Sequence, residues 1–227
     1  MAKHTLFQRA AIFLLETFGN QTWGFRPNLI APFVEQKGSL PALFWFANTI
    51  PKYERILESW GPIRTHLLAT EISALNGCRY CTNGHAYALQ LHYLKATEQL
   101  FPLSEADILA VMTLPEGDIL ARFEQALEQA DLSAAILDMR RMAELRQSEP
   151  IATTAKDRDI LHLIKMFSVL SACGVRGNVR IDQAHDPINK NRAWRDRYAI
   201  LRRAQTRMPA KAVEPEVTVL NPSDLYL

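Results

Sequence analysis

Apolar residues recur every three or four positions along almost the whole chain, which is the spacing of one buried face of an α-helix. The first such helix is predicted over residues 6–17, and Gly19 with Asn20 is expected to end it. Residues 20–41 are rich in Gly and Pro and predict a loop with a short helix near 31–36. Further helices are predicted over residues 51–60, 62–75, 78–100, 105–111, 157–173 and, in two pieces, 119–147. The pattern therefore predicts an all-α fold.

The chain shows no internal repeat, and we expect a single all-helical domain over residues 1–227. Pro150 marks the best boundary within it, so that residues of about 150–227 would form a second helical half. The longest alternating run, residues 217–220, predicts a short strand or an arm on a neighbouring chain.

Composition narrows the function classes. Of 227 residues, 48% are hydrophobic and 22% charged, which excludes wholesale disorder. Three cysteines are too few for a disulfide scaffold, and a net charge of +2 excludes a globally basic nucleic-acid binder. The apolar run 10–15 is too short for a signal sequence, and no run of about 20 apolar residues could span a bilayer. A cytoplasmic protein without a membrane partner is expected.

Two cysteines separated by two residues carry the chemistry. Asn76 and Gly77 are expected to end one helix, so that the next begins at Cys78. Both sulfurs, of Cys78 and Cys81, would then lie in a first helical turn, close enough to form a disulfide. Unpaired backbone N–H groups and the helix dipole favour the thiolate there.

A proton acceptor follows one turn later. His85 lies four residues after Cys81 and so on the same helix face, where its imidazole can take the thiol proton. Glu71, from the preceding helix, could orient that imidazole as a third member of a relay. A capping or surface carboxylate is nearly as good an interpretation of Glu71.

The spelling Glu-x6-Cys-x2-Cys-x3-His follows a Pro-Ala-Leu-Phe-Trp-Phe-Ala segment. This combination resembles the alkylhydroperoxidase D / carboxymuconolactone decarboxylase superfamily, in particular its Cys-x-x-Cys-containing branch. The phrase Ser-Ala-Leu-Asn-Gly-Cys-Arg-Tyr-Cys-Thr-Asn-Gly-His is close to that branch's core signature. The resemblance covers roughly residues 40–100.

The resemblance implies an alkylhydroperoxidase D-like helical bundle, here with a helical C-terminal extension, which assembles into homo-oligomers. It also implies thiol-dependent reduction of a hydroperoxide, with an external dithiol as reductant and without a metal or organic cofactor. By position, Cys81 would be the peroxidatic thiol, Cys78 the resolving thiol, and Glu71 with His85 the proton relay. In the best-studied branch the relay acid lies further upstream, at the position of His66, so the choice between Glu71 and His66 stays open.

Other interpretations of the motif compete with the peroxidase or disulfide reductase. One is a structural zinc site of Cys78, Cys81 and His85, completed by Glu71, His66 or His92, although no second Cys or His pair follows. A second is a pair of inert buried thiols, and a third is a non-catalytic redox sensor. Cys173 lies in an apolar stretch and is interpreted as a small hydrophobic residue.

The C-terminal region carries a local excess of positive charge that the near-neutral net charge of the chain does not show. Residues 190–211 hold eight Lys and Arg residues and one acid, interleaved with apolar residues, and predict an amphipathic basic helix. Such a helix could make the protein a nucleic-acid or anionic-membrane binding module. We favour docking of its apolar side on the chain's own core, with arginines paired to acids elsewhere. The nearby His185 is interpreted as part of a turn or cap.

Overall fold

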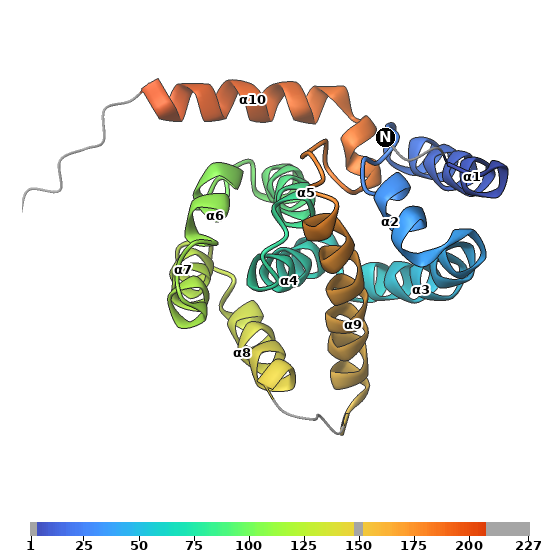
Figure 1. The fold of residues 1–227 in the computed structure, drawn as a ribbon. Helices are drawn as coiled ribbons and strands as arrows, with labels where there is room; N and C mark the ends of the chain where they lie inside the picture. The colour runs from blue at the N-terminus through green and yellow to red at the C-terminus, as the bar shows by residue number, and fades with distance from the viewer. Residues whose placement is uncertain (1–3, 148–151, 208–227) are drawn as a thin grey trace, which may run out of the picture.

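The computed structural model describes residues 4–147 and 152–207, which form ten α-helices and one 3-10 helix without a strand (Figure 1). The elements are α1 (Leu6–Trp23), α2 (Ile30–Lys37), α3 (Ser39–Trp60), α4 (Pro62–Leu75), α5 (Arg79–Thr97), α6 (Glu105–Val111), α7 (Glu116–Gln129), α8 (Ser133–Gln147), α9 (Ala155–Arg176), η1 (Pro187–Lys190) and α10 (Arg192–Arg207). The predicted all-α class is confirmed. None of the described helices is long and apolar enough to cross a membrane. Pro150 and residues 217–220 lie outside the described residues.

Helices α4 and α5 form a hairpin at the centre of the molecule, and α9 packs against both (Figure 1). Every residue of α4 from Thr65 to Ala74 is buried, including the fully enclosed Leu67, Leu68 and Ile72. Burial on all sides is typical of a helix in the interior of a larger bundle. The polar side chains of this helix are therefore placed inside the protein, where they need partners from neighbouring helices.

Two glycines that follow predicted helices lie inside the observed helices instead. Helix α1 continues past Gly19 to Trp23 and ends at Gly24, whose φ of 85° is left-handed. Helix α9 likewise continues past Gly174 to Arg176. Each glycine leaves room for a neighbour, because a Cβ at Gly19 would lie 2.5 Å from the Pro27 ring. Their role is close packing rather than termination.

Pro51 was expected to open a helix, but it lies inside α3, which begins twelve residues earlier at Ser39. Proline removes one backbone N–H from a helix interior and usually bends or breaks it. Here the helix is held by the burial of Ala42 on one side of Pro51 and of Tyr53 and Ile56 on the other. Tertiary packing thus overrides the local breaker.

The basic helix α10 docks on its own chain, across α5 (Figure 1). Tyr198 is buried, and Arg202 donates to the Gln90 side chain at 2.7 Å and to the Phe101 carbonyl at 2.8 Å. Arg197 pairs with Glu98 on the end of α5 at 3.1 Å. These contacts agree with the docking interpretation of the sequence.

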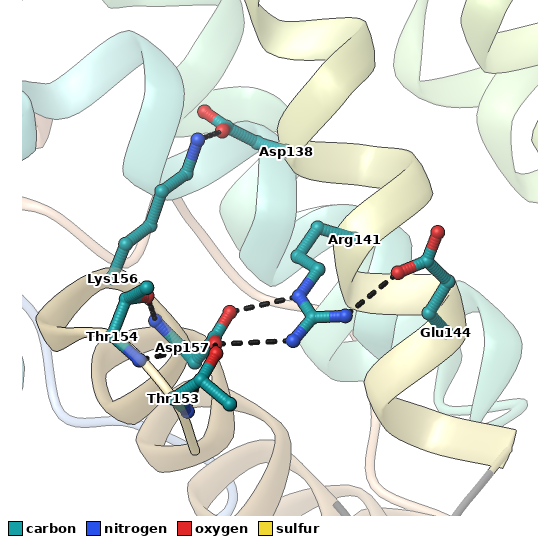
Figure 2. A network of polar contacts seen from close by, with 7 residues as sticks. All are labelled: Asp138, Arg141, Glu144, Thr153, Thr154, Lys156 and Asp157. Carbon is teal, nitrogen blue, oxygen red and sulfur yellow. Dashed lines mark hydrogen bonds and ion pairs between the residues drawn. The ribbon is translucent and has the colours of Figure 1, made fainter. Parts of the chain in front are cut away.

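A polar network joins α8 to the start of α9 (Figure 2). The Nη1 atom of Arg141 donates to Glu144, and its Nε and Nη2 atoms donate to the two oxygens of the Asp157 carboxylate, at 2.8 and 3.0 Å. The same carboxylate accepts from Thr153, and Asp157 with Thr154 forms a capping box at the start of α9. Figure 2 also shows Lys156 reaching the buried Asp138 on α8. These bonds hold the N-terminal end of α9 against α8.

Candidate active site

The turn between α4 and α5 places the two cysteines as the sequence predicts. Gly77 adopts a left-handed φ of 72°, and the Cys78 N–H donates back to the Ser73 carbonyl at 3.0 Å. Cys78 is then the N-cap of α5, and its sulfur accepts the Cys81 N–H at 3.2 Å. A thiolate at this position is stabilised by a backbone donor and by the helix dipole.

The two sulfurs of Cys78 and Cys81 lie 2.8 Å apart, as free thiols, and both residues are 1% exposed. The α9 residues Ser171 and Gly174 face them, and a Cβ at Gly174 would lie 2.7 Å from the Cys78 sulfur. Only glycine therefore lets α9 approach the pair this closely. A disulfide of about 2.05 Å requires the sulfurs to close by less than 1 Å.

The two thiols differ in acidity. A hydrogen bond from the Cys81 thiol, helped by the Cys81 backbone N–H, lowers the pKa of Cys78 despite its burial. Burial raises the pKa of Cys81 well above its usual value, and its role as donor to Cys78 adds to the effect. Cys81 thus keeps its proton until a base removes it.

A line of hydrogen-bonded side chains runs inward from His85. The Nδ1 atoms of His85 and His66 lie 3.1 Å apart, and the Nε2 atom of His66 lies 2.9 Å from Oδ2 of Asp186. The other oxygen of Asp186 lies 2.9 Å from His92 Nε2 and accepts the Ile188 N–H at 2.7 Å. Helices α4 and α5 supply the histidines, and the N-cap of η1 supplies the carboxylate.

The carboxylate fixes the imidazole tautomers. Burial alone would raise the pKa of Asp186, but hydrogen bonds from His66 and His92 outweigh it and hold the pKa well below its usual value. A carboxylate only accepts, so His66 donates to it from Nε2 and keeps a lone pair on Nδ1. His85 must then donate from its own Nδ1, which leaves its Nε2 unprotonated. Burial first, and then the nearby His185 and His66, lower the pKa of His85, which favours this neutral form.

Glu71 does not reach this line of side chains. Its carboxylate is fully buried on α4 and has no hydrogen-bond partner among the described residues. Burial, followed by the charge of Asp138, raises the pKa of Glu71 well above its usual value. Glu71 lies five residues after His66, or about 140° around the helix, so the two cannot face the same neighbour. The structure thus places His66, the open alternative, beside His85.

Cys81 and His85 line one small cavity, of about 70 Å³, that is otherwise almost entirely apolar. Its walls come from α1, α3, α5 and α9 and include Leu15, Phe46, Tyr53, Met166, Phe167 and Leu170. The exposed residues Phe18 and Glu54 also line it, which places its mouth between α1 and α3. Cys78 is not among the lining residues. The second thiol therefore lies behind Cys81 as seen from the cavity.

His185 is a cavity residue that the sequence interpretation missed. Its Nε2 lies 2.9 Å from Oδ1 of Asp182, and its ring packs on Tyr80 at 4.7 Å and on His85 at 5.3 Å between centroids. The ring lies against Gly84, where a Cβ would overlap it, and the His185 N–H donates to the Gly84 carbonyl at 3.1 Å. The mostly polar segment 182–186 was the signal in the sequence that could have pointed to His185. From the sequence alone, His185 is interpreted only as part of a turn or cap.

The zinc interpretation of the cysteine pair does not fit this geometry. Two thiolates about 2.3 Å from one tetrahedral zinc ion lie roughly 3.8 Å apart, well beyond the 2.8 Å between these sulfurs. Within the described ranges, the one group with ligand atoms close enough for a metal ion is His66, His92 and Asp186, all within 4.8 Å. Those atoms already satisfy one another through hydrogen bonds. We describe the group as a hydrogen-bond network.

The all-α arrangement around a Cys-x2-Cys helix start agrees with the fold that the sequence resemblance implies, at the level of class. Comparison with family models, with curated proteins and with solved structures gave no match for this chain. Its function is therefore argued from the site itself.

Proposed function

We propose that this protein is a thiol-dependent peroxidase that reduces small organic hydroperoxides through Cys81 and Cys78. The observation that carries the proposal is the shared cavity. Cys81 and His85 line one apolar pocket, while the Cys78 sulfur lies 2.8 Å from that of Cys81 on the side away from it. A substrate thus meets one thiol, with a base beside it and a second thiol behind it.

In the first step, His85 Nε2 removes the proton from the Cys81 thiol. This base is needed because the pKa of Cys81 is raised by burial. The thiolate attacks the terminal oxygen of the hydroperoxide, the O–O bond breaks, and the leaving alkoxide takes the proton from His85. Cys81 becomes a sulfenic acid and the substrate leaves as an alcohol. Asp186, acting through His66, holds His85 in the tautomer that this step requires.

In the second step, the Cys78 sulfur attacks the sulfenic sulfur of Cys81, and a disulfide forms with release of water. The lowered pKa of Cys78 favours its nucleophilic form. An external dithiol then reduces the disulfide by exchange and returns both thiols. The cycle consumes one hydroperoxide and one dithiol and yields alcohol, water and a disulfide of the reductant.

Access to the site favours a peroxidase over a reductase of protein disulfides. Both cysteines are 1% exposed, and the cavity in front of Cys81 holds about 70 Å³. A folded protein could not bring its disulfide to these sulfurs, whereas a small hydroperoxide or dithiol can enter between α1 and α3. The apolar walls suit an alkyl hydroperoxide rather than a charged one.

Assembly into homo-oligomers stays a prediction. It is supported by large apolar side chains left exposed on α1 and α3, among them Leu6 at 80%, Phe7 at 79% and Phe44 at 67%. Size-exclusion chromatography with light scattering measures the assembly directly.

Single cysteine variants test the proposed function. Reduced protein should lose two thiols per chain on adding one equivalent of cumene hydroperoxide, and Cys81→Ser should abolish this loss. Cys78→Ser should stop at a sulfenic acid on residue 81, which dimedone traps. Cys173→Ser, which changes a buried free thiol outside the cavity, is the matched control and should turn over normally. Normal turnover by Cys81→Ser with a dithiol reductant would contradict the proposal and favour a non-catalytic role.

A further inference from the structure

Helices α3 and α9 together form a second, open groove on the outside of the molecule, with a volume of about 640 Å³. Four of its lining residues are cations, namely Lys52 and Arg55 from α3 and Arg158 and Lys165 from α9. Asp159 is the single acid that lines it. None of these residues lines the thiol cavity, so the two sites are separate.

The cations follow from helix spacing. Lys52 and Arg55 are one turn apart on α3, and Arg158 and Lys165 are two turns apart on α9, so that each pair shares a helix face. Because α3 packs against α9, the two faces meet at one groove. The side of each helix that lines the thiol cavity, with Ile50 on α3 and Phe167 on α9, is a different one.

Over the part of the chain that the structure describes, these four cations are not paired with an acid. Within residues 4–147 and 152–207, no carboxylate forms an ion pair with any of the four, whose side chains are exposed. The Arg55 side chain donates to the Pro51 carbonyl of its own helix, and the Asp159 carboxylate accepts the Trp60 indole N–H at 3.2 Å. By contrast, Arg197 of α10 has an acidic partner on the chain, Glu98.

A histidine, His162, lies among these cations. His162 lines the groove between Arg158 and Lys165, and its Nε2 lies 3.2 Å from the Thr49 carbonyl. The pKa of His162 is lowered chiefly by burial; the hydrogen bond with Thr49 and the charge of Asp159 oppose this effect, and the charges of Lys52 and Arg55 add to it. Like charges concentrated in one concave surface raise the local concentration of an anion.

We propose that the α3–α9 groove binds a small organic molecule that carries two or more phosphate groups. Lys and Arg are the side chains that bind phosphate oxygens through charge-assisted hydrogen bonds. The backbone positions of Arg158 and Lys165 are separated by about 10 Å along the helix axis, so the cations are spread along the groove and can contact more than one phosphate. The apolar side chains of Ile56 and Leu161 also line the groove and can contact the organic part. The volume lies within the range of roughly 300–1,000 Å³ for small-molecule sites.

Isothermal titration of the full chain with sodium pyrophosphate, adenosine 5′-diphosphate and inorganic phosphate tests this site, at about 0.15 M salt so that weak surface attraction is screened. We expect one site per chain for pyrophosphate and for the diphosphate, each binding at least tenfold more tightly than inorganic phosphate. The double variant Arg55→Gln/Arg158→Gln should weaken both at least tenfold. The control Arg122→Gln/Arg192→Gln removes the same charge from exposed residues elsewhere and should change neither by more than twofold.

The outcomes separate the alternatives. Tighter binding of the nucleoside diphosphate than of pyrophosphate means that the organic part is recognised, and equal binding means that the phosphates suffice; both support the site. Equal weakening by the groove and control variants would show general attraction to the charge of the protein. That result would overturn the proposal. The proposal would also be overturned if neither pyrophosphate nor adenosine 5′-diphosphate bound at 1 mM, or if a single-stranded oligonucleotide of 20 nucleotides bound more tightly than both. The groove variants should keep their peroxide turnover, so failure here and failure of the thiol chemistry are distinguishable.

Discussion

The imidazoles of His66 and His85 face each other across the α4–α5 hairpin, with their Nδ1 atoms 3.1 Å apart. This contact links the cavity, which His85 lines, to the buried carboxylate of Asp186, which His66 contacts through Nε2 at 2.9 Å. A carboxylate more than 100 residues downstream of His85 thereby sets which nitrogen of His85 carries the proton.

Asp186→Asn should lower peroxide turnover by about 10²–10⁴-fold, because the amide no longer holds His66 and His85 in one tautomer. Asp186 does not line the cavity, so the KM for the hydroperoxide should stay within about twofold. Its charge also raises the pKa of both histidines, so the acid limb of the rate profile should move to lower pH in the variant. Steady-state rates between pH 4 and 8 measure all three effects.

The matched control for that experiment is Asp196→Asn, which removes an exposed carboxylate paired with Arg192 at 3.4 Å. It should leave turnover and the pH profile unchanged. A drop in turnover at Asp186→Asn with an unmoved acid limb would show that the residue serves stability alone.

Glu71→Gln should retain turnover, since no contact joins Glu71 to His85. It should also change the pH dependence of stability. The native pKa of Glu71 is raised, so its contribution to stability is fully present below its ordinary pKa of 4.5 and is lost as the pH rises towards the native value. The variant should therefore melt higher than the wild type at pH 8 and close to it at pH 4, as measured by circular dichroism. A large loss of turnover in this variant would show that Glu71 takes part in the proton relay after all.

Gly174→Ala should disturb the cysteine pair, because its Cβ would lie 2.7 Å from the Cys78 sulfur. We expect a loss of about 1–3 kcal/mol in the free energy of unfolding, typical of overpacking. Disulfide formation after hydroperoxide addition should slow as well. Gly117→Ala is the control, since a Cβ there meets nothing within 4 Å, and it should be neutral or stabilising by up to about 1 kcal/mol. Equal effects of both changes on disulfide formation would contradict the close approach of α9.

Acid should loosen the junction of α8 and α9. The pKa of Asp157 is lowered, chiefly by its hydrogen bonds with Arg141 and then with Thr153. A lowered carboxylate pKa gives stability that is present above the ordinary value of 3.8 and is lost as the pH falls through the native value. Thermal melts between pH 7 and 2 should therefore show a smaller acid-induced drop for Arg141→Gln, which lacks this stabilisation throughout, than for the wild type. Arg122→Gln, on the exposed face of α7, should keep the wild-type slope.

The local features of the site could be predicted from the sequence. Gly77 ends one helix because its left-handed φ suits glycine, and the Cys-x2-Cys spacing then places both sulfurs in the next first turn. His85 follows Cys81 by one turn, so both face the same cavity. These relationships depend on helix geometry over a few residues, which the order of residues fixes.

Tertiary packing decided the rest. Gly19, Pro51 and Gly174 are local breakers, yet each lies within a helix because burial and close approach to neighbours outweigh propensity. The sequence alone left open whether Glu71 or His66 contacts His85. Both residues lie on one helix, about 140° apart, and only the packing of α4 shows which of its faces turns towards α5. Asp186 reaches His66 from a distant segment. That contact is a property of the folded chain, because no local pattern encodes which buried histidine a remote carboxylate will meet.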